Sequence, residues 1–343
     1  MAPDIAVAEQ RDERETLIGS SPLTTSAPIG GPPAIETRAL HKRFGRKVVV
    51  HDLTFTVQQG EVFGFLGPNG AGKTTSIKML MGLVRPTSGE ARLLGLPAGR
   101  REARRRIGFL PELFRFHDWL SGREVLDLHG RLYGMSTAHR SEAIPRALDL
   151  VGLSRRGDDP LRTYSKGMQQ RIGIAQAILN DPLVVFLDEP TSALDPVGRL
   201  DVRNLIRHLR DEGRTVLLNS HLLSEVEMVC DRVAIIHHGR VATIGPLDDL
   251  RKGDVLVQLL LNTLPPDHRA ILDAHGRVHD VLDWRTDRVQ VTLELPSSVQ
   301  VPALVAALAA AGAQIHSVTP HTTTLEELFF NIVRDHPEDE VRA

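Results

Sequence analysis

Apolar residues follow two successive patterns along this chain, and both begin only after a polar stretch. From Ile35 short β-like runs appear, such as Val48–Val50 and Leu53–Val57, and strand-like and helix-like segments then alternate to about Gly245. This alternation is typical of an α/β domain with a largely parallel sheet. We therefore predict one domain of this class over residues 34–249.

The two ends of the chain lack such patterning. Residues 1–33 are first charged and then rich in Ser, Thr, Pro and Gly, with little apolar periodicity. A segment of this composition buries too little apolar surface to offset the entropy of ordering. We predict a disordered extension over residues 1–33 and a short tail over residues 336–343.

Residues 254–335 form the second patterned unit. Its segments follow the order strand, helix, strand, strand, helix, strand, at residues 254–261, 266–274, 278–284, 289–295, 299–311 and 314–318. The clearest strand is Val289–Leu295, whose even-numbered side chains are polar. The order predicts a small ferredoxin-like α+β domain. Thr324 and Glu327 fit a capping box that opens a last helix through Val333.

A glycine-rich segment between a predicted strand and a predicted helix is the strongest chemical signal. The strand is Glu61–Leu66, and helical spacing begins at Ser76. The residues between them fit the pattern G-x-x-x-x-G-K-[ST]: Gly67, Pro68, Asn69, Gly70, Ala71, Gly72, Lys73, Thr74 and Thr75. Glycines let backbone N–H groups close around phosphates, Lys73 reaches the outer phosphates, and Thr74 can ligate Mg²⁺. The segment predicts a nucleoside triphosphate site rather than a turn without a ligand.

Composition narrows the class of protein and its compartment. The 343 residues include 41 Lys and Arg against 43 Asp and Glu, so the net charge of −2 gives no reason to expect nucleic acid. Cys230 is the only cysteine, which excludes an internal disulfide and favours a buried thiol. The N-terminus has no apolar core of a signal peptide, and Val301–Ala313 is shorter than the ~20 residues that span a bilayer. We expect a soluble, cytoplasmic protein that meets a membrane only through a partner.

Two carboxylates follow an apolar run further along the chain. Leu183–Leu187 reads as a buried strand, and it is followed by Asp188 and Glu189. Such a strand can deliver Asp188 to the Mg²⁺ shell and place Glu189 beside the outermost phosphate to orient an attacking water. Paired acids also occur at plain surface turns, but the phosphate loop upstream favours the catalytic interpretation.

A second anion site is indicated at Ser165-Lys166-Gly167-Met168, which enters a helical run. A serine hydroxyl, backbone N–H groups and the positive end of the helix dipole all favour an anion there. An ordinary helix cap is the more common explanation for an isolated serine at such a position.

The order of these motifs resembles the nucleotide-binding subunit of an ABC transporter. Thr191–Pro196 follows the paired acids, and a strand-like run, Val216–Ser220, ends at His221. The resemblance covers roughly residues 35 to 245. It implies a P-loop ABC ATPase domain with a parallel-sheet core, an antiparallel β subdomain and a helical insertion. It also implies ATP and Mg²⁺ as cofactors.

The resemblance further implies residue roles. Ser165 to Met168 match the signature turn, Asp195 the D-loop, and His221 the switch histidine. Phe44 occupies the place of the aromatic residue that stacks on adenine, for which a planar apolar side chain serves. Glu112 sits at the position of the Q-loop. The resemblance therefore implies three catalytic residues, namely Glu189, His221 and Glu112.

Three residues depart from the family pattern. Glu112 replaces a glutamine and adds an anion that only accepts hydrogen bonds, while Lys166 replaces a glycine and Met168 a glutamine. Such substitutions recur in a branch of ABC proteins that resembles exporter ATPases working with separately encoded permeases. The end of the chain, Thr324–Phe330, also resembles the accessory domain of that branch.

The resemblance implies two partners: a second copy of the chain, bound head to tail, and a polytopic membrane permease. We expect no nucleic-acid partner. The alternatives are a soluble ABC-type ATPase of nucleic-acid repair, translation or cluster assembly, and an importer subunit.

Three surface features are ambiguous at this level. A cluster of large apolar residues after Glu112 is either core of the helical insertion or a groove for the permease: Leu113, Phe114, Phe116, Trp119 and Leu120. The basic run Arg100–Arg106 favours a solvated helix face over a lipid contact. The 15 histidines show no metal-ligand spacing.

Overall fold

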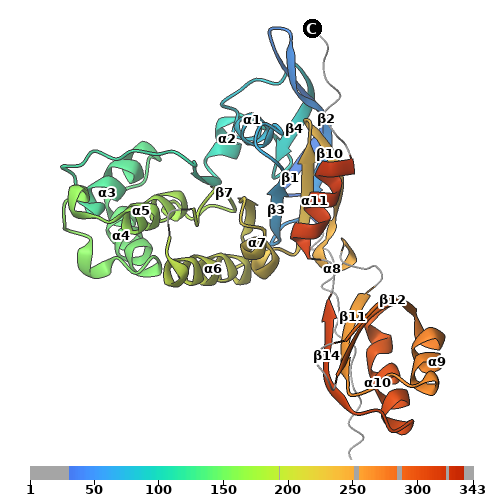
Figure 1. Ribbon diagram of the computed structural model, residues 1–343. Helices are drawn as coiled ribbons and strands as arrows, with labels where there is room; N and C mark the ends of the chain where they lie inside the picture. The colour runs from blue at the N-terminus through green and yellow to red at the C-terminus, as the bar shows by residue number, and fades with distance from the viewer. Residues whose placement is uncertain (1–30, 193, 251–254, 284–287, 322–323, 336–343) are drawn as a thin grey trace, which may run out of the picture. The chain divides into compact units, whose positions relative to one another are not determined.

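We describe the protein from a computed structural model, in which residues 31–192, 194–250, 255–283, 288–321 and 324–335 are described. The predicted tail, and the predicted extension as far as residue 30, lie outside these residues. Figure 1 shows the elements in sequence order from blue to red.

A six-stranded sheet organises the first domain, in the order β10-β9-β3-β8-β7-β6. The strands β9, β3, β8, β7 and β6 run parallel, and β10 pairs antiparallel at one edge. Their bounds are β3 Val62–Leu66, β6 Ile107–Leu110, β7 Val184–Asp188, β8 Thr215–Asn219, β9 Arg232–His237 and β10 Arg240–Pro246. The predicted α/β class with a largely parallel sheet is confirmed.

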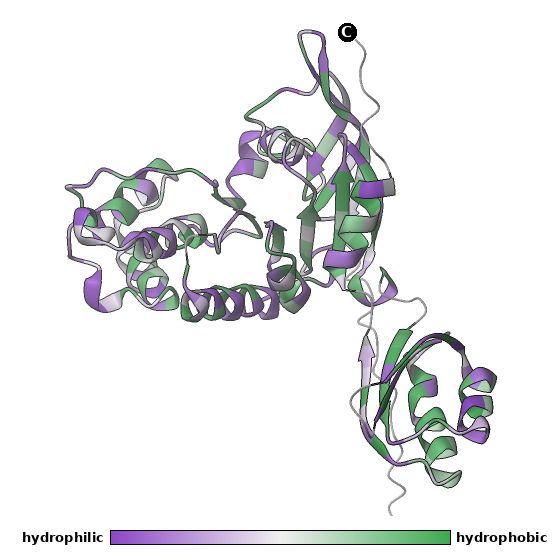
Figure 2. Ribbon diagram, in the orientation of Figure 1, coloured by the Kyte–Doolittle hydropathy of each residue, from purple (hydrophilic) through white to green (hydrophobic). Residues whose placement is uncertain are grey.

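Both faces of this sheet are covered, which is why its strands are continuous apolar runs. Along β3, Phe63 and Phe65 face one hydrophobic cluster while Val62 and Leu66 face the other. This alternation follows from the two-residue period of a strand. In Figure 2 the strands of the sheet are mostly hydrophobic, whereas much of the surface helix α6 (Pro196–Asp211) is hydrophilic.

The antiparallel β subdomain is a four-stranded sheet in the order β2-β1-β4-β5. Its strands are β1 Ile35–Phe44, β2 Lys47–Val57, β4 Ser88–Leu93 and β5 Leu96–Pro97. The two short runs seen in the sequence are a single strand, β2. Asp52 adopts a positive φ of 49° within it, where the pairing with β1 shifts register. A β-bulge of this kind lets one strand continue past an interruption of its apolar pattern.

Helices fill the connections between the strands. Their bounds are α1 Lys73–Leu80, α2 Arg101–Arg104, α3 Gly122–Leu132, α4 Thr137–Leu150, α5 Lys166–Ile178, α7 Leu223–Val229 and α8 Leu247–Leu250, with short 3₁₀ turns at Ser154–Arg156 and Leu161–Thr163. Helices α3, α4 and α5 pack together as the predicted helical insertion (Figure 1). Its opening is fixed by a capping box at α3, in which Ser121 and Glu124 bond reciprocally.

The apolar cluster after Glu112 divides between the two expected environments. Phe114, Phe116 and Leu120 pack against the core that the insertion shares with the sheet. Leu113 and Trp119 are 88% and 69% exposed. The cluster is therefore partly core of the insertion and partly free surface.

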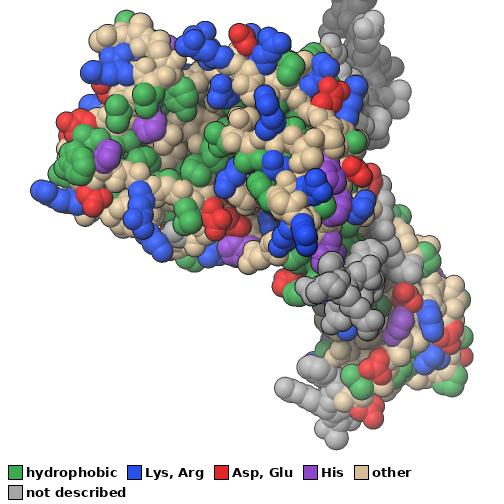
Figure 3. All heavy atoms as spheres, turned by 90° about the horizontal axis from the view of Figure 1, so that it is seen from above, with side chains coloured by type: hydrophobic (Ala, Val, Ile, Leu, Met, Phe, Trp, Pro, Cys, Tyr) green, Lys and Arg blue, Asp and Glu red, His purple; other side chains and the backbone are tan. Residues whose placement is uncertain are grey.

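Two smaller expectations can also be compared with the structure. In the basic run, α2 is an exposed helix that buries only Ala103, so its arginines are solvated as predicted. Cys230 is buried as expected, and burial raises the pKa of its thiol well above the ordinary value. On the face seen in Figure 3, Lys and Arg side chains are interspersed with acidic and apolar ones.

The C-terminal domain has the ferredoxin-like topology that its segment order predicts. Its sheet runs β12-β13-β11-β14 and is antiparallel throughout. The elements are β11 Val255–Leu261, α9 Pro266–His275, β12 Arg277–Asp283, β13 Val289–Leu295, a 3₁₀ turn at Ser298–Gln300, α10 Val301–Ala310 and β14 Ile315–His321. Helices α9 and α10 cover one face of the sheet (Figure 1), where Leu272, Leu304 and Leu308 complete its core.

The last helix, α11 (Leu325–Asp335), returns to the core of the first domain. The predicted capping box is present, since Thr324 N–H donates to Glu327 and Glu327 N–H donates to the Thr324 hydroxyl. Leu325 is fully buried in the cluster that includes α5 and α7, and its N–H donates to the Glu227 carboxylate of α7. The sequence pattern places this helix in the C-terminal unit over residues 254–335, but in the structure it packs on α7 of the first domain, because its apolar face completes the core there.

No helix among the described residues combines the length and apolarity needed to cross a bilayer.

Candidate nucleotide-binding site

The glycine-rich loop connects β3 to α1, as its flanking patterns predicted. Two of its glycines, Gly67 and Gly72, are required by space. A Cβ at Gly67 would lie 2.2 Å from the Ile236 carbonyl oxygen, and one at Gly72 would lie 2.7 Å from the Val49 oxygen. Gly72 also has a φ of 98°, which disfavours any residue with a side chain. The loop backbone thus packs closely against the backbone of Ile236 and Val49, where no side chain would fit.

Lys73 is the basic group of the loop. Its Nζ donates to the carbonyl oxygens of Gly67 (2.5 Å) and Pro68 (3.1 Å), so that the ammonium lies over the loop. Burial lowers its pKa, and the carboxylates of Glu189, Asp188 and Glu112 oppose that shift. The N-terminus of α1 has no side-chain cap from Gly72, which leaves its N–H groups open to an anion.

The acidic side of the site begins where β7 ends. Asp188 is 2% exposed and accepts a short hydrogen bond from the Asn219 side-chain amide at the end of the neighbouring β8. Burial raises the pKa of Asp188, while Asn219 and Lys73 act against this shift. A buried carboxylate opposite a lysine is suited to hold a divalent cation.

Glu189 follows directly and points toward the switch segment. Its Oε2 lies 2.6 Å from Nδ1 of His221, and its backbone N–H donates to the Asn219 carbonyl (2.8 Å). Burial raises the pKa of Glu189, and the neighbouring His221 opposes the rise. A carboxylate with a raised pKa, oriented by a histidine, is suited to act as a general base.

A hollow of about 500 Å³ joins Lys73, Glu189 and His221, whereas Asp188 does not line it and is held behind Asn219, which does. The predicted residues that line it are Asn69, Gly70, Ala71, Gly72, Lys73, Thr74, Thr75, Glu112, Glu189 and His221. Sequence reasoning gave no role to three further lining residues, Val49, Ser192 and Asn219. Asn219 could have been found as a polar residue that ends a buried strand beside the strand of the paired acids.

The remaining predicted residues do not line this hollow. Phe44 ends β1 and is 50% exposed, with the Lys42 ammonium 4.7 Å from its ring centroid. Ser165 caps α5 by accepting the N–H of Met168 (3.2 Å), so it acts as an ordinary helix cap within this chain. Asp195 caps α6 in the same way through the N–H of Gly198 (2.8 Å). Neither Ser165 nor Asp195 therefore lines the hollow that contains Lys73.

The residues present fit a nucleoside triphosphate with Mg²⁺. The cradle at Gly67 and Gly72 admits only bare backbone, and Thr74 lines the same hollow as Lys73. Among the described residues, no cluster of three or more His, Cys, Asp or Glu side chains forms a metal cage. Mg²⁺ is usually held by one or two protein ligands together with phosphates and water, and Thr74 and Asp188 could supply those ligands.

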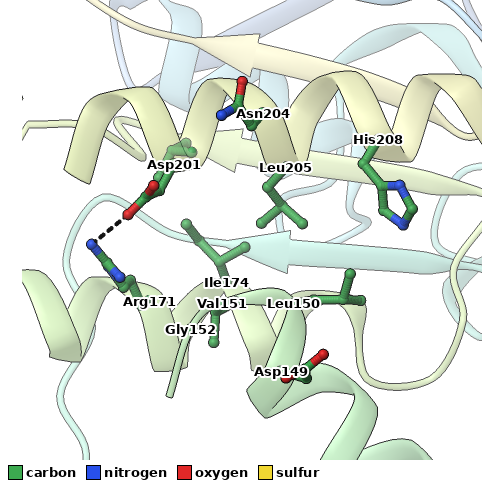
Figure 4. Close-up of a pocket in the computed structure, with 11 residues that line it drawn as sticks. Asp149, Leu150, Val151, Gly152, Arg171, Ile174, Asp201, Asn204, Leu205 and His208 are labelled. Carbon is green, nitrogen blue, oxygen red and sulfur yellow. Dashed lines mark hydrogen bonds and ion pairs between the residues drawn. The ribbon is translucent and has the colours of Figure 1, made fainter. Parts of the chain in front are cut away.

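A second hollow, of about 360 Å³, lies between α5 and α6 and is shown in Figure 4. Its lining is mainly apolar and includes the buried side chains of Ile174, Val202 and Leu205. At one end Arg171 of α5 forms an ion pair with Asp201 of α6 (2.8 Å). None of the predicted site residues lines this hollow.

A strand, a glycine cradle with a lysine, a helix N-terminus, and a buried acid at the end of β7 in the same parallel sheet together define a P-loop nucleotide-binding domain. A family model described as ABC transporter matches residues 50–192. An ABC transporter ATP-binding protein of Synechocystis is 47% identical over 211 residues, which are 61% of this chain and 60% of that protein. The bacitracin transport ATP-binding protein BcrA of Bacillus licheniformis is 35% identical over 304 residues, 87% of this chain and 97% of its own length.

Among solved structures, an ATP binding subunit of an ABC transporter superposes with a TM-score of 0.59 at 34% identity, covering 64% of this chain and 92% of that one. The chain belongs to the family of ABC transporter ATP-binding proteins. The match spans about 60% of the cyanobacterial relative but almost all of BcrA.

Proposed function

We propose that this chain hydrolyses ATP to drive export of a substrate through a separate membrane permease. The observation that carries the proposal is the pair formed by Glu189 and His221, which faces the phosphate loop across one hollow. This arrangement is suited to activate water against a terminal phosphate rather than only to bind a nucleotide.

Each residue of the site has a defined task in this reaction. Lys73 and the N–H groups of the loop bind and orient the phosphates, and Phe44 stacks against the adenine. Thr74 and Asp188 would hold Mg²⁺, which would supply neutralisation of charge on the phosphates. Glu189 orients the attacking water and accepts its proton, and His221 fixes the Glu189 carboxylate. Glu112, which lines the same hollow, contacts either the attacking water or Mg²⁺.

A second copy of the chain completes the site. Ser165 to Met168 and Asp195 match nucleotide-contacting motifs but lie outside the hollow that contains Lys73. In a head-to-tail dimer, the signature turn of one copy faces the phosphate loop of the other, and the arrangement is isologous. ATP then bridges the two copies, and hydrolysis removes the bridge.

The partner that uses this cycle is a polytopic permease, with the chain bound at the inner face of the cell membrane. BcrA is by its name the ATP-binding protein of a bacitracin transport system, and its similarity extends over 87% of this chain. The exposed Leu113 and Trp119, beside Glu112, offer an apolar contact close to the hollow. This reading is favoured over a soluble ATPase of repair or translation because of that relative.

The substitution Glu189→Gln tests the hydrolytic role. Removing the base while keeping the shape of the side chain should lower kcat by about 100-fold or more, because general-base catalysis contributes about 10²–10⁴-fold. Binding of ATP should remain, since the phosphate contacts are intact. Phosphate release and nucleotide titration measure the two quantities separately.

Glu225→Gln is a matched control, because Glu225 is as buried as Glu189 but pairs with Arg203 away from the hollow. Full phosphate release by the Glu189 variant would contradict the assignment. Purification from native membranes tests the partner: recovery of a polytopic membrane protein supports export, whereas recovery of ribosomes or DNA contradicts it.

A further inference from the structure

The backbone of Glu189 is held by contacts from three separate segments. Its φ of 56° lies in the left-handed region, which non-glycine residues seldom adopt. Its N–H donates to the Asn219 carbonyl of β8, and its carbonyl accepts from the Ser192 hydroxyl (3.1 Å) and from Nε2 of Gln170 (3.3 Å). A rare conformation at a functional residue persists only where its surroundings fix it.

Gln170 is the contact that comes from the signature helix. It lies on α5, five residues beyond Ser165, and is 5% exposed. A rise of about 1.5 Å per residue places it about 7.5 Å along the helix from the signature turn. The side chain thus links a buried point of α5 to the peptide unit that directs the Glu189 carboxylate.

Helix α5 is also tied to the helix that follows the D-loop. Arg171, the next residue after Gln170, pairs with Asp201 of α6 in Figure 4. Asp195 caps the start of that same helix. A shift of α5 would therefore displace the backbone of Glu189 through Gln170. It would also displace α6, the helix that follows the D-loop, through Arg171.

We propose that Gln170 is a positioning residue, which transmits the position of the signature turn to Glu189 of the same chain. The proposal rests on the composite dimer described under the proposed function. In that dimer, Ser165 contacts the nucleotide bound by the partner, while Glu189 serves the nucleotide bound by its own chain. Gln170 therefore makes hydrolysis at one site depend on occupancy of the other.

Two variants separate positioning from packing. Gln170→Met keeps the length and most of the volume of the side chain but removes the amide donor. Gln170→Glu keeps the shape and turns an acceptor toward the Glu189 carbonyl. Because the lost hydrogen bond acts on the geometry of the base, kcat should fall by about fivefold in the Met variant and further in the Glu variant. KM for ATP and the affinity for nucleotide should stay at wild-type values.

Gln176→Met is the matched control. Gln176 lies on the same helix, and its side chain hydrogen-bonds to Tyr133 instead of Glu189. Its substitution removes one hydrogen bond of α5 and should leave kcat unchanged. Thermal unfolding of all variants shows whether α5 remains folded.

A double-mutant cycle tests the relay itself. If Gln170 transmits the contact made by Ser165, the variant with both Ser165→Ala and Gln170→Met should have the kcat of Ser165→Ala alone. Multiplicative losses in the double variant would overturn the relay.

Wild-type kcat in Gln170→Met, or an equal loss in Gln176→Met, would overturn the positioning role. These results are distinct from failure of the proposed function. That failure would appear as absent ATP hydrolysis by the wild-type protein or as full activity of Glu189→Gln.

Discussion

Individual residues at this site are placed by contacts that a motif does not contain. The phosphate loop could be predicted residue by residue, because its glycines and lysine are contiguous and flanked by clear patterns. The role of Asn219, which holds both Asp188 and the backbone of Glu189, could not. It depends on β8 lying beside β7, and strand neighbours in a parallel sheet are distant in sequence.

Lys73→Ala tests the loop at this scale. Removing the ammonium deletes the only lysine that lines the described hollow, so nucleotide affinity should fall by at least about 100-fold. Titration with a fluorescent ATP analogue measures this loss. Lys78→Ala, an exposed lysine on the same helix, should bind as the wild type does. Unchanged binding in the Lys73 variant would refute the phosphate role.

The sequence predicts which segments form helices and strands, but it predicts less well which elements pack against one another. The segment order of the C-terminal domain predicted its topology, because β-α-β-β-α-β has few ways to form one sheet. Likewise the capping box of α11 was visible in four residues. Periodicity shows that a helix has an apolar face but not which core receives that face, so the contact of α11 with α7 could not be foreseen.

Leu325→Ala tests that contact. Leu325 is fully buried, and a leucine truncated to alanine in a core costs about 2–5 kcal/mol. The free energy of unfolding of the ATPase domain should fall by about this amount. Phe330→Ala is the control, because Phe330 is 53% exposed on the same helix and should cost far less. Equal losses would show that α11 contributes only through its own folding.

At the scale of the whole molecule, the described chain holds half of each proposed composite site. The sequence motifs indicate nucleotide contacts at both Lys73 and Ser165. In the structure Lys73 lines the hollow and Ser165 does not. The family resemblance, rather than any pattern within the chain, supplied the second copy. The distance between motifs along a sequence does not state whether they meet within one chain or between two.

Glu189→Gln should therefore dimerise when ATP is added. In this variant ATP remains bound and bridges the two copies, whereas hydrolysis in the wild type opens them again. Sedimentation velocity with and without ATP measures the change. Ser165→Ala in the same background removes a proposed bridge contact and should shift the variant back toward monomer. A variant that stays monomeric with saturating ATP would contradict the composite site.

The packing of α11 on α7 also has a consequence for how the protein is made. The hydrogen bond from Leu325 to Glu227 joins residues 98 positions apart. A ribosome adding about 5–20 residues per second takes roughly 5 to 20 seconds to cross that interval. During that time α7 has emerged but the helix that covers it does not yet exist. The core beside His221 is thus completed only after Leu325 has been added, and a chain that stops before that residue leaves an apolar surface exposed beside α7.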